Sequence, residues 1–450
     1  MTFKLYNALT GKIDVFKPRK SKKINLFVCG ITPYDYPHIG HAKTYTQFDF
    51  IVKYLKFKKY KVFYLQNVTD IDDRIIEKAK SENKSWKEIS TKYASVFLDN
   101  MKDLHINSID KYAYATEYIP QIISQVKTLI KKGYAYKIED GYYFDLKKFP
   151  DYGKLSGRLM NNAESAVSRI DDSKNKKNKG DFCLWKFSKS DEPSWPSDIG
   201  SGRPGWHIED TAITETFFGP QYDIHGGARD LIFPHHEAEI AQMESASGKK
   251  PLVKYWLHTG FLNVKGTKMS KSLHNFITIS NVLEEYDYTI IRFFYLSQHY
   301  RAPIDFSDKL LEQSKNSLNR INEFFHNSKG KKSKLKKALI SKARKLFYEA
   351  LDNDFNTPEA FSILFDFIRD ANKIGPNNEC YKFMEEINNF LDILSLQDDK
   401  IPQNIIKLAE KRLLARKTKD WKLSDSIRDE INKEGYLIED TENGFRIKKK

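Results

Sequence analysis

Two short cationic segments, far apart in the chain, carry residue types that can bind phosphate. The first is His38-Ile39-Gly40-His41, which follows an apolar run and precedes a helical pattern. Its two imidazoles therefore lie at a helix N-terminus, where anions bind readily, and Gly40 allows a nucleotide to approach closely. The second is Lys268-Met269-Ser270-Lys271-Ser272, with two ammonium groups and two hydroxyls. Such groups stabilise charge on a phosphoryl leaving group, although either segment alone is equally compatible with a chance turn or a solvated loop.

Sulfur, nitrogen and oxygen donors in separate segments indicate a second chemistry, metal binding. Cys29 follows the first apolar run, Asp210 comes later in the chain, and His235 and Glu239 are four residues apart. On a helix this spacing puts both side chains on one face. With Cys29 they form a donor set suited to zinc. The alternative is a small buried thiol beside a hydrogen-bonded core histidine, such as His236.

The elements that must position these residues predict a parallel sheet. Residues 24–28 and 61–65 are typical of buried strands, and residues 42–57 between them are typical of an amphipathic helix. A polar loop at 67–73 follows the second strand. This βαβ order predicts an α/β, Rossmann-like doubly wound sheet, whose ligands bind at the carboxyl ends of the strands. Another amphipathic helix is expected at 117–132.

Beyond residue 288 the pattern becomes helical. Apolar residues at helical spacing occur at 310–325, 334–351 and 358–373, and a final piece has helices near 405–419 and 424–434 before a β-like tail. The expected domains are a first half of the catalytic domain at 1–110, a connective insertion at 111–200 with a polar loop at 171–179, a second half at 201–287, a helical domain at 288–398 and a small terminal module at 399–450.

Composition is compatible with a nucleic-acid partner. The 450 residues carry a formal net charge of +15, which favours polyanionic partners, although abundant lysine can also reflect coding bias. No apolar run is long enough to span a bilayer, and the first residues resemble neither a signal peptide nor a presequence, so we expect a cytoplasmic protein. The three cysteines are widely separated, which argues against a disulfide framework.

Together and in this order, the two cationic segments resemble the signature of class I aminoacyl-tRNA synthetases. Further segments narrow the resemblance to the cysteinyl-tRNA synthetase family, and it spans nearly the whole chain. These segments are Cys29-Gly30, Tyr34-Asp35-Tyr36, residues 67–73, residues 202–209 (Gly-Arg-Pro-Gly-Trp-His-Ile-Glu), residues 223–227 (Asp-Ile-His-Gly-Gly), residues 233–237 (Phe-Pro-His-His-Glu), residues 256–260 (Trp-Leu-His-Thr-Gly) and residues 268–273.

The resemblance implies a zinc site with one unusual ligand. In that family two cysteines, a histidine and a glutamate hold zinc, which binds the substrate thiolate; here they correspond to Cys29, His235 and Glu239, with Asp210 in place of the second cysteine. The exchange keeps the charge of the set but replaces a soft donor with a hard one. We expect Asp210 to ligate Zn²⁺ directly. It could instead orient a three-ligand site, or the metal could be absent, and replacement of the lost thiolate by Cys183 is a further alternative.

The resemblance also implies roles in adenylate formation. By role, the residues are His38, His41, Lys268 and Lys271 for catalysis, Gly40, Gly226, Gly227, Asp230 and Lys271 for ATP binding, and Thr69 and Trp206 for the amino-acid pocket. Catalysis would depend on positioning and charge stabilisation, with no protein nucleophile.

The implied reaction is activation of L-cysteine by ATP with Mg²⁺, then transfer to the 3′ end of tRNA-Cys. Residues 288–398 would form an anticodon-binding domain and residues 399–450 a tRNA-binding module, in a protein expected to be monomeric. Two other functions stay open. One is a related cysteine ligase that forms an amide with a small amine, and the other is a catalytically silent, nucleic-acid-binding paralogue.

Overall fold

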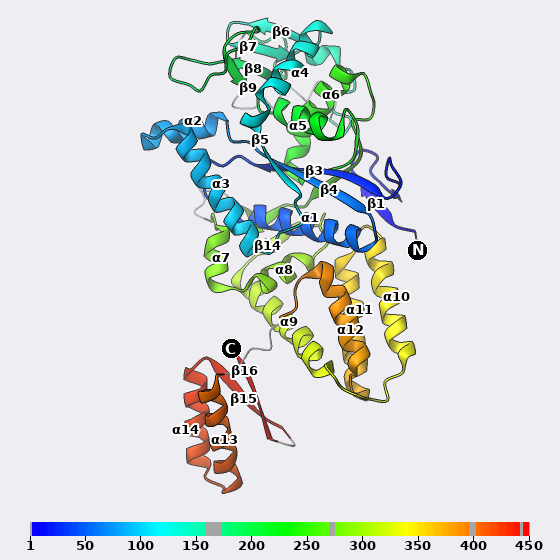
Figure 1. Ribbon diagram of the computed structural model, residues 1–450, viewed down its shortest axis with the longest axis vertical. Coiled ribbons are helices and arrows are strands. Elements are labelled where there is room, and N and C mark those ends of the chain that lie inside the picture. The colour runs from blue at the N-terminus through cyan, green and yellow to red at the C-terminus, as the bar shows by residue number, and fades with distance from the viewer. Residues whose placement is uncertain are drawn as a thin grey trace. The chain divides into compact units, whose positions relative to one another are not determined.

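The computed structural model describes residues 2–158, 173, 175–269, 275–395, 402–441 and 444–449. It divides the chain into two compact units, Met1–Ile393 and Leu394–Lys450 (Figure 1). Lys271 and parts of the predicted polar loop at 171–179 lie outside the described residues.

A parallel five-stranded sheet forms the centre of the first unit. Its order is β11-β10-β3-β4-β5. The strands are β3 (Lys23–Ile31), β4 (Lys61–Val68), β5 (Lys111–Tyr114), β10 (Tyr222–Ala228) and β11 (Val253–Thr259). All four pairings are parallel, and Leu26 of β3 lies opposite Tyr64 of β4 and Ile224 of β10. The predicted doubly wound α/β sheet is confirmed, and β5 extends it beyond the expected start of the insertion at 111.

Both faces of this sheet are covered, which explains its apolar central strand. Leu26, Phe27 and Val28 have no exposed surface. Helix α1 (Ile39–Phe57) packs on one face, and α5 (Ile208–Phe218) packs on the other with α4 (Ile119–Lys131) and α6 (Glu237–Ser247) beside it (Figure 1). Strands covered on both faces are expected to be apolar throughout rather than alternating.

Helix α1 begins at Ile39, earlier than the predicted start at 42, because a side chain caps it. His38 has extended backbone, and its Nδ1 accepts a hydrogen bond from the backbone N–H of Gly40 at 3.1 Å. An N-cap side chain satisfies one of the donors that a helix leaves unpaired in its first turn. The first cationic segment is therefore built into the start of this helix.

Smaller elements surround the central sheet in the first unit. An antiparallel sheet contains β6 (Ala135–Ile138), β7 (Gly141–Phe144), β8 (Cys183–Phe187) and β9 (Gly202–Pro204). The others are the hairpin β1 (Lys4–Asn7) and β2 (Lys12–Val15), the helices α2 (Asp73–Glu82) and α3 (Trp86–Asp103), and a three-stranded sheet of β12 (Leu262–Val264), β13 (Thr267–Lys268) and β14 (Ile304–Phe306).

A helical region completes the first unit. It contains α7 (Ile279–Glu285), α8 (Tyr288–Leu296), α9 (Asp308–Ser328), α10 (Lys337–Asp352), α11 (Thr357–Ile374) and α12 (Asn378–Leu391). The helices predicted at 310–325, 334–351 and 358–373 are confirmed, whereas α12 was not predicted. An ion pair between Arg292 of α8 and Asp49, at 2.9 Å with neither side chain exposed, joins this region to α1, the helix that covers one face of the sheet.

The second unit is small and has its own core. Helices α13 (Gln403–Lys417) and α14 (Trp421–Lys433) pack together, and β15 (Tyr436–Thr441) pairs antiparallel with β16 (Gly444–Lys449). Ile405, Ala409, Ile427 and Ile431 fill the space between them. Across both units, none of the described helices combines the length and apolar character that crossing a bilayer requires.

Candidate active site

The carboxyl ends of the parallel strands open into a cavity of about 580 Å³. Segments that are distant in the chain meet in its wall: the ends of β3 and β4, the start of α1, the loop before α5 and the turn before α6. The predicted site residues that line it are Cys29, His38, Gly40, His41, Thr69, Trp206, Asp210, Asp230 and His235. Ligands of doubly wound sheets bind at this edge.

The two histidines of the first segment form one structured unit at the start of α1. The Nδ1 of His41 accepts a hydrogen bond from the backbone N–H of His38 at 3.2 Å, and the two rings stack with centroids 3.8 Å apart. Burial lowers the pKa of His38 to about 4 and the pKa of His41 well below its ordinary value. Both rings are thus neutral near pH 7. Because each Nδ1 accepts a backbone hydrogen bond, each Nε2 carries the proton and can donate to a phosphate oxygen.

The flanks of the second segment lie beside the first. The backbone N–H of Ile39 donates to Ile277 at 3.1 Å, and that of Ile279 donates to Pro37 at 3.0 Å. Met269 and Phe276 also line the cavity. Lys268 ends strand β13, and residues 270–274, Lys271 included, lie outside the described residues. Met269 and the residues that follow the second segment therefore lie at the same cavity as the first segment, and the roles predicted for the lysines stay predictions.

Four side chains that we call the outer set, Cys29, Asp210, His235 and Glu239, converge on one point with buried donor atoms. The Nε2 of His235 lies 3.0 Å from Oδ2 of Asp210 and 3.2 Å from Oε1 of Glu239. The Sγ of Cys29 lies 3.5 Å from Asp210 and 3.8 Å from Glu239. Tetrahedral zinc with ordinary bond lengths separates its ligand atoms by about 3.3 to 3.7 Å. The outer set is thus a possible metal-binding cluster.

The electrostatics of the outer set also fit a divalent cation. Burial first, and then the neighbouring carboxylates Glu239 and Asp210, raise the pKa of the Cys29 thiol. Burial and Asp210 likewise raise the pKa of Glu239. Acidic groups crowded out of water in this way resist ionisation unless a positive charge offsets them. A metal ion supplies that charge, and binding it releases the protons.

Elements that begin at the cavity position these donors. Asp210 lies in the first turn of α5, and its Oδ1 accepts a hydrogen bond from Nδ2 of Asn67 at 2.5 Å. His235 lies in the wide turn Ile232–His236 before α6, and its Nδ1 contacts Nδ1 of His207 at 2.7 Å. Glu239 follows in the first turn of α6. Cys183, the alternative donor, belongs to β8 and to neither metal-binding group among the described residues.

Thr69 and Trp206 form the wall next to the outer set. The Trp206 ring stacks on His235 with centroids 4.4 Å apart, and the hydroxyl of Thr69 donates to Glu209. Glu209 is buried, and burial together with Asp210 raises its pKa. Sequence reasoning did not single out Glu209 as a functional residue. The sequence did offer one signal, because Glu209 ends the motif segment 202–209 that also contains Trp206.

The glycine pair Gly226 and Gly227, near the carboxyl end of β10, does not line the cavity. A Cβ on Gly226 would lie 2.3 Å from the ring of Phe48, and a Cβ on Gly227 would lie 3.0 Å from the ring of His236. The space that these glycines leave is therefore filled by protein side chains. Their predicted role in ATP binding stays a prediction, whereas Asp230 is exposed and does line the cavity.

Because burial keeps His38 neutral, we expect the stability of the metal-free chain to fall as the pH is lowered. A folded-state pKa of about 4, below the unfolded value of 6.5, means that the unfolded chain takes up the proton first as the pH falls. The stability that neutral His38 contributes is therefore fully present above the unfolded-state pKa and is lost as the pH falls toward the folded-state pKa. Between about pH 7 and about pH 4.5, His38→Asn should lose about 2.5 kcal/mol less stability than the unaltered chain. Urea unfolding measures this, and equal losses would contradict it.

Comparison with known proteins agrees with this architecture. Residues 15–316 match the family model of the tRNA synthetases class I (C) catalytic domain, and residues 346–397 match the DALR domain. The solved structure of Mycobacterium tuberculosis methionyl-tRNA synthetase with methionyl-adenylate superposes with a TM-score of 0.61 at 15% identity, over 82% of this chain and 88% of that one. At such identity the likeness shows the fold alone. The fold and the catalytic-domain match define a class I aminoacyl-tRNA synthetase.

Relatives that match nearly the whole chain identify its family within this class. A cysteine–tRNA ligase of Thermoplasma volcanium is 45% identical over 448 residues, which cover 97% of each chain. Another from Thermococcus gammatolerans is 41% identical over 470 residues, with 99% of this chain and 98% of the relative covered. The chain belongs to the cysteine–tRNA ligase family.

Proposed function

We propose that this protein activates L-cysteine with ATP as the adenylate and transfers the cysteinyl group to the 3′ end of tRNA-Cys. The observation that carries the proposal is that one cavity joins the capped start of α1 to a buried sulfur, nitrogen and oxygen donor set. The first is suited to phosphates and the second to a thiolate-binding metal. The relatives named cysteine–tRNA ligase, which match this chain from end to end, support the same activity.

In the first half-reaction, a carboxylate oxygen of cysteine attacks the α-phosphorus of ATP, and pyrophosphate leaves. His38 and His41 would donate from Nε2 to phosphate oxygens at the N-terminus of α1, where the helix dipole also favours negative charge. Lys268 and Lys271 would add positive charge near the phosphates, as the sequence predicts. Trp206 and Thr69 would orient the amino acid.

We assign zinc to Cys29, Asp210, His235 and Glu239. When bound, the ion supplies a positively charged anchor that distinguishes a thiolate from a hydroxyl. Direct ligation by Asp210 is supported by its Oδ2, which lies 3.0 Å from His235 and 3.5 Å from Cys29, as two ligands of one ion would. Cysteine and serine differ by one atom, and a pocket built on shape alone separates such neighbours poorly.

Transfer to tRNA requires further surfaces, and we propose that residues 288–398 bind the anticodon region and residues 399–450 add a second tRNA contact. The helices of the first region follow the catalytic domain directly, and residues 346–397 match the DALR domain. We propose that the first half of the catalytic domain, expected at 1–110, continues through β5 (Lys111–Tyr114) and that the second half spans 201–287, with the insertion between them.

Cysteine-dependent ATP–pyrophosphate exchange tests the proposal, followed by charging of a tRNA-Cys transcript and zinc analysis of the same sample. We expect exchange with cysteine, little with serine, and one zinc per chain. Absence of exchange with cysteine would overturn the activity. Exchange without charging of any tRNA would instead support the amide-forming ligase, and exchange without zinc would remove only the metal assignment.

A further inference from the structure

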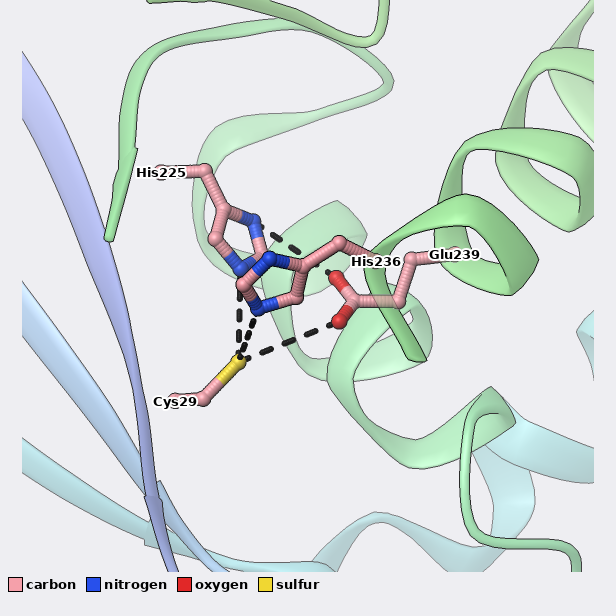
Figure 2. A group of neighbouring side chains, drawn as sticks. All are labelled: Cys29, His225, His236 and Glu239. Carbon is pink, nitrogen blue, oxygen red and sulfur yellow. Dashed lines mark hydrogen bonds and ion pairs between the residues drawn. The ribbon is translucent and has the colours of Figure 1, made fainter. Parts of the chain in front are cut away.

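A second group of donors meets at the same cysteine. The Nε2 atoms of His225 and His236 lie 3.3 Å and 3.2 Å from Sγ of Cys29, and Glu239 completes the group (Figure 2). We call Cys29, His225, His236 and Glu239 the inner set. All four side chains are buried, and their donor atoms lie within 4.8 Å of one another. The distances from the sulfur to the two imidazole nitrogens, 3.3 Å and 3.2 Å, are close to those between tetrahedral zinc ligands, about 3.3 to 3.7 Å.

Each inner histidine is held by its other ring nitrogen. The Nδ1 of His225 lies 2.7 Å from the hydroxyl of Tyr222, and the Nδ1 of His236 lies 2.9 Å from Nε2 of His258. A partner on Nδ1 fixes the ring and leaves Nε2 for a metal, which is the usual support of a metal-binding histidine. Both partners are able to accept the Nδ1 proton, since a tyrosine hydroxyl and a neutral imidazole have lone pairs.

The two carboxylate oxygens of Glu239 lie beside different histidines. Its Oε1 faces His235 of the outer set at 3.2 Å. Its Oε2 makes no hydrogen bond with any residue that the structure describes, although Glu239 is fully buried, and lies 3.5 Å from Nδ1 of His225. A buried carboxylate oxygen without a hydrogen bond costs free energy, which a bound cation would recover.

The two sets differ in softness and in access to substrate. The outer set offers one sulfur, one nitrogen and two carboxylates because Asp210 replaces a thiolate, whereas the inner set offers one sulfur, two imidazoles and one carboxylate. The inner set is therefore the softer one and suits zinc at least as well. Asp210 and His235 line the cavity, but His225 and His236 do not and have no exposed surface.

We propose that Cys29, His225, His236 and Glu239 form an inner binding site for a divalent metal ion, which excludes occupation of the outer set. The two sites share Cys29 and Glu239, so one ion occupies one site at a time. Because His225 and His236 do not line the cavity, an ion held by them would be withdrawn from a substrate sulfur there. The inner site thus stores the metal in an inactive position, an interpretation that rests on the proposed function for its outer counterpart.

Zinc binding by Asp210→Ala tests the inner site, because this change disables the outer set and leaves the inner set complete. X-ray absorption at the zinc edge counts bound imidazoles, and elemental analysis gives zinc per chain. We expect one zinc per chain with two imidazoles in Asp210→Ala, and loss of that zinc when His236→Gln is added. Bound zinc with a single imidazole, or no bound zinc, would overturn the inner site.

A second variant and a separate assay keep the result interpretable. His235→Ala also disables the outer set, and the same two imidazoles are expected, so a folding failure of Asp210→Ala, detected by circular dichroism, does not prevent the test. The imidazole count is independent of catalysis. A single imidazole in these variants, with normal cysteine-dependent exchange by the unaltered chain, would reject the inner site and leave the proposed function intact. Two imidazoles in these variants, together with no cysteine-dependent exchange by the unaltered chain, would support the inner site and overturn the proposed function.

Discussion

Cys29→Ala is expected to remove bound zinc and to lower cysteine-dependent ATP–pyrophosphate exchange roughly 1,000-fold, because a lost metal contact removes several kcal/mol of transition-state stabilisation. Cys29 is the only sulfur ligand among the described residues in either metal-binding group, so neither position retains its set. The remaining activity should prefer cysteine over serine by roughly 100-fold at most, as expected for a pocket that selects by shape and hydrogen bonding.

The control for this variant is Cys380→Ala, which truncates another buried cysteine. Cys380 lies in α12 with no exposed surface, and its Sγ contacts Asn377 at 3.6 Å. This change should leave zinc content and exchange unaltered. Zinc content by elemental analysis and exchange kinetics with both amino acids measure the effect. Retention of zinc and of exchange by Cys29→Ala would refute the metal assignment.

His41→Asn should lower kcat for exchange about 100- to 1,000-fold with little change in KM for cysteine, the size of effect seen when a positioned donor to developing charge is lost. The asparagine retains a polar group near the backbone N–H of His38, to which His41 now bonds at 3.2 Å, so the cap of α1 is largely kept. It lacks the Nε2 donor. We propose that the cysteine pocket lies at the Thr69 and Trp206 wall, so binding of the amino acid should persist.

His105→Asn is the matched control for His41→Asn. His105 stacks on Tyr288 with centroids 3.6 Å apart, and its φ of 55° is one that asparagine adopts more readily than most residues. Its side chain is substantially exposed and does not line the cavity. Equal losses of kcat in both variants would show that the His41 effect is structural, and an unchanged kcat in His41→Asn would contradict its role with phosphate.

Much of the central fold was predictable because local patterns specify it. The apolar run before Cys29, the helical pattern after it and the second strand predicted a parallel βαβ unit, and the sheet has that form. The expectation that α1 is amphipathic was wrong, because residues 42–52 are all buried. Boundaries were less accurate where side chains decide them. The start of α1 depends on a hydrogen bond from Gly40 to His38, and a pattern of apolar residues does not contain that information. Helix α12 was missed for a different reason: Cys380, Phe383, Met384, Ile387 and Leu391 do recur at helical spacing, so the pattern was present in the sequence and was overlooked.

The types and the order of the site residues can be read from the chain: two cationic segments, Cys29, and Asp210 where the family resemblance implied a second cysteine. Which donors meet depends on how the chain folds. The fold brings Asp210 within 3.5 Å of Cys29, and it turns His225 and His236 toward the same sulfur. Residue spacing along one strand or helix constrains only its own face. Distances between β3, β10 and α6 arise from how the sheet and helices pack, so the second donor set became visible only in the folded chain.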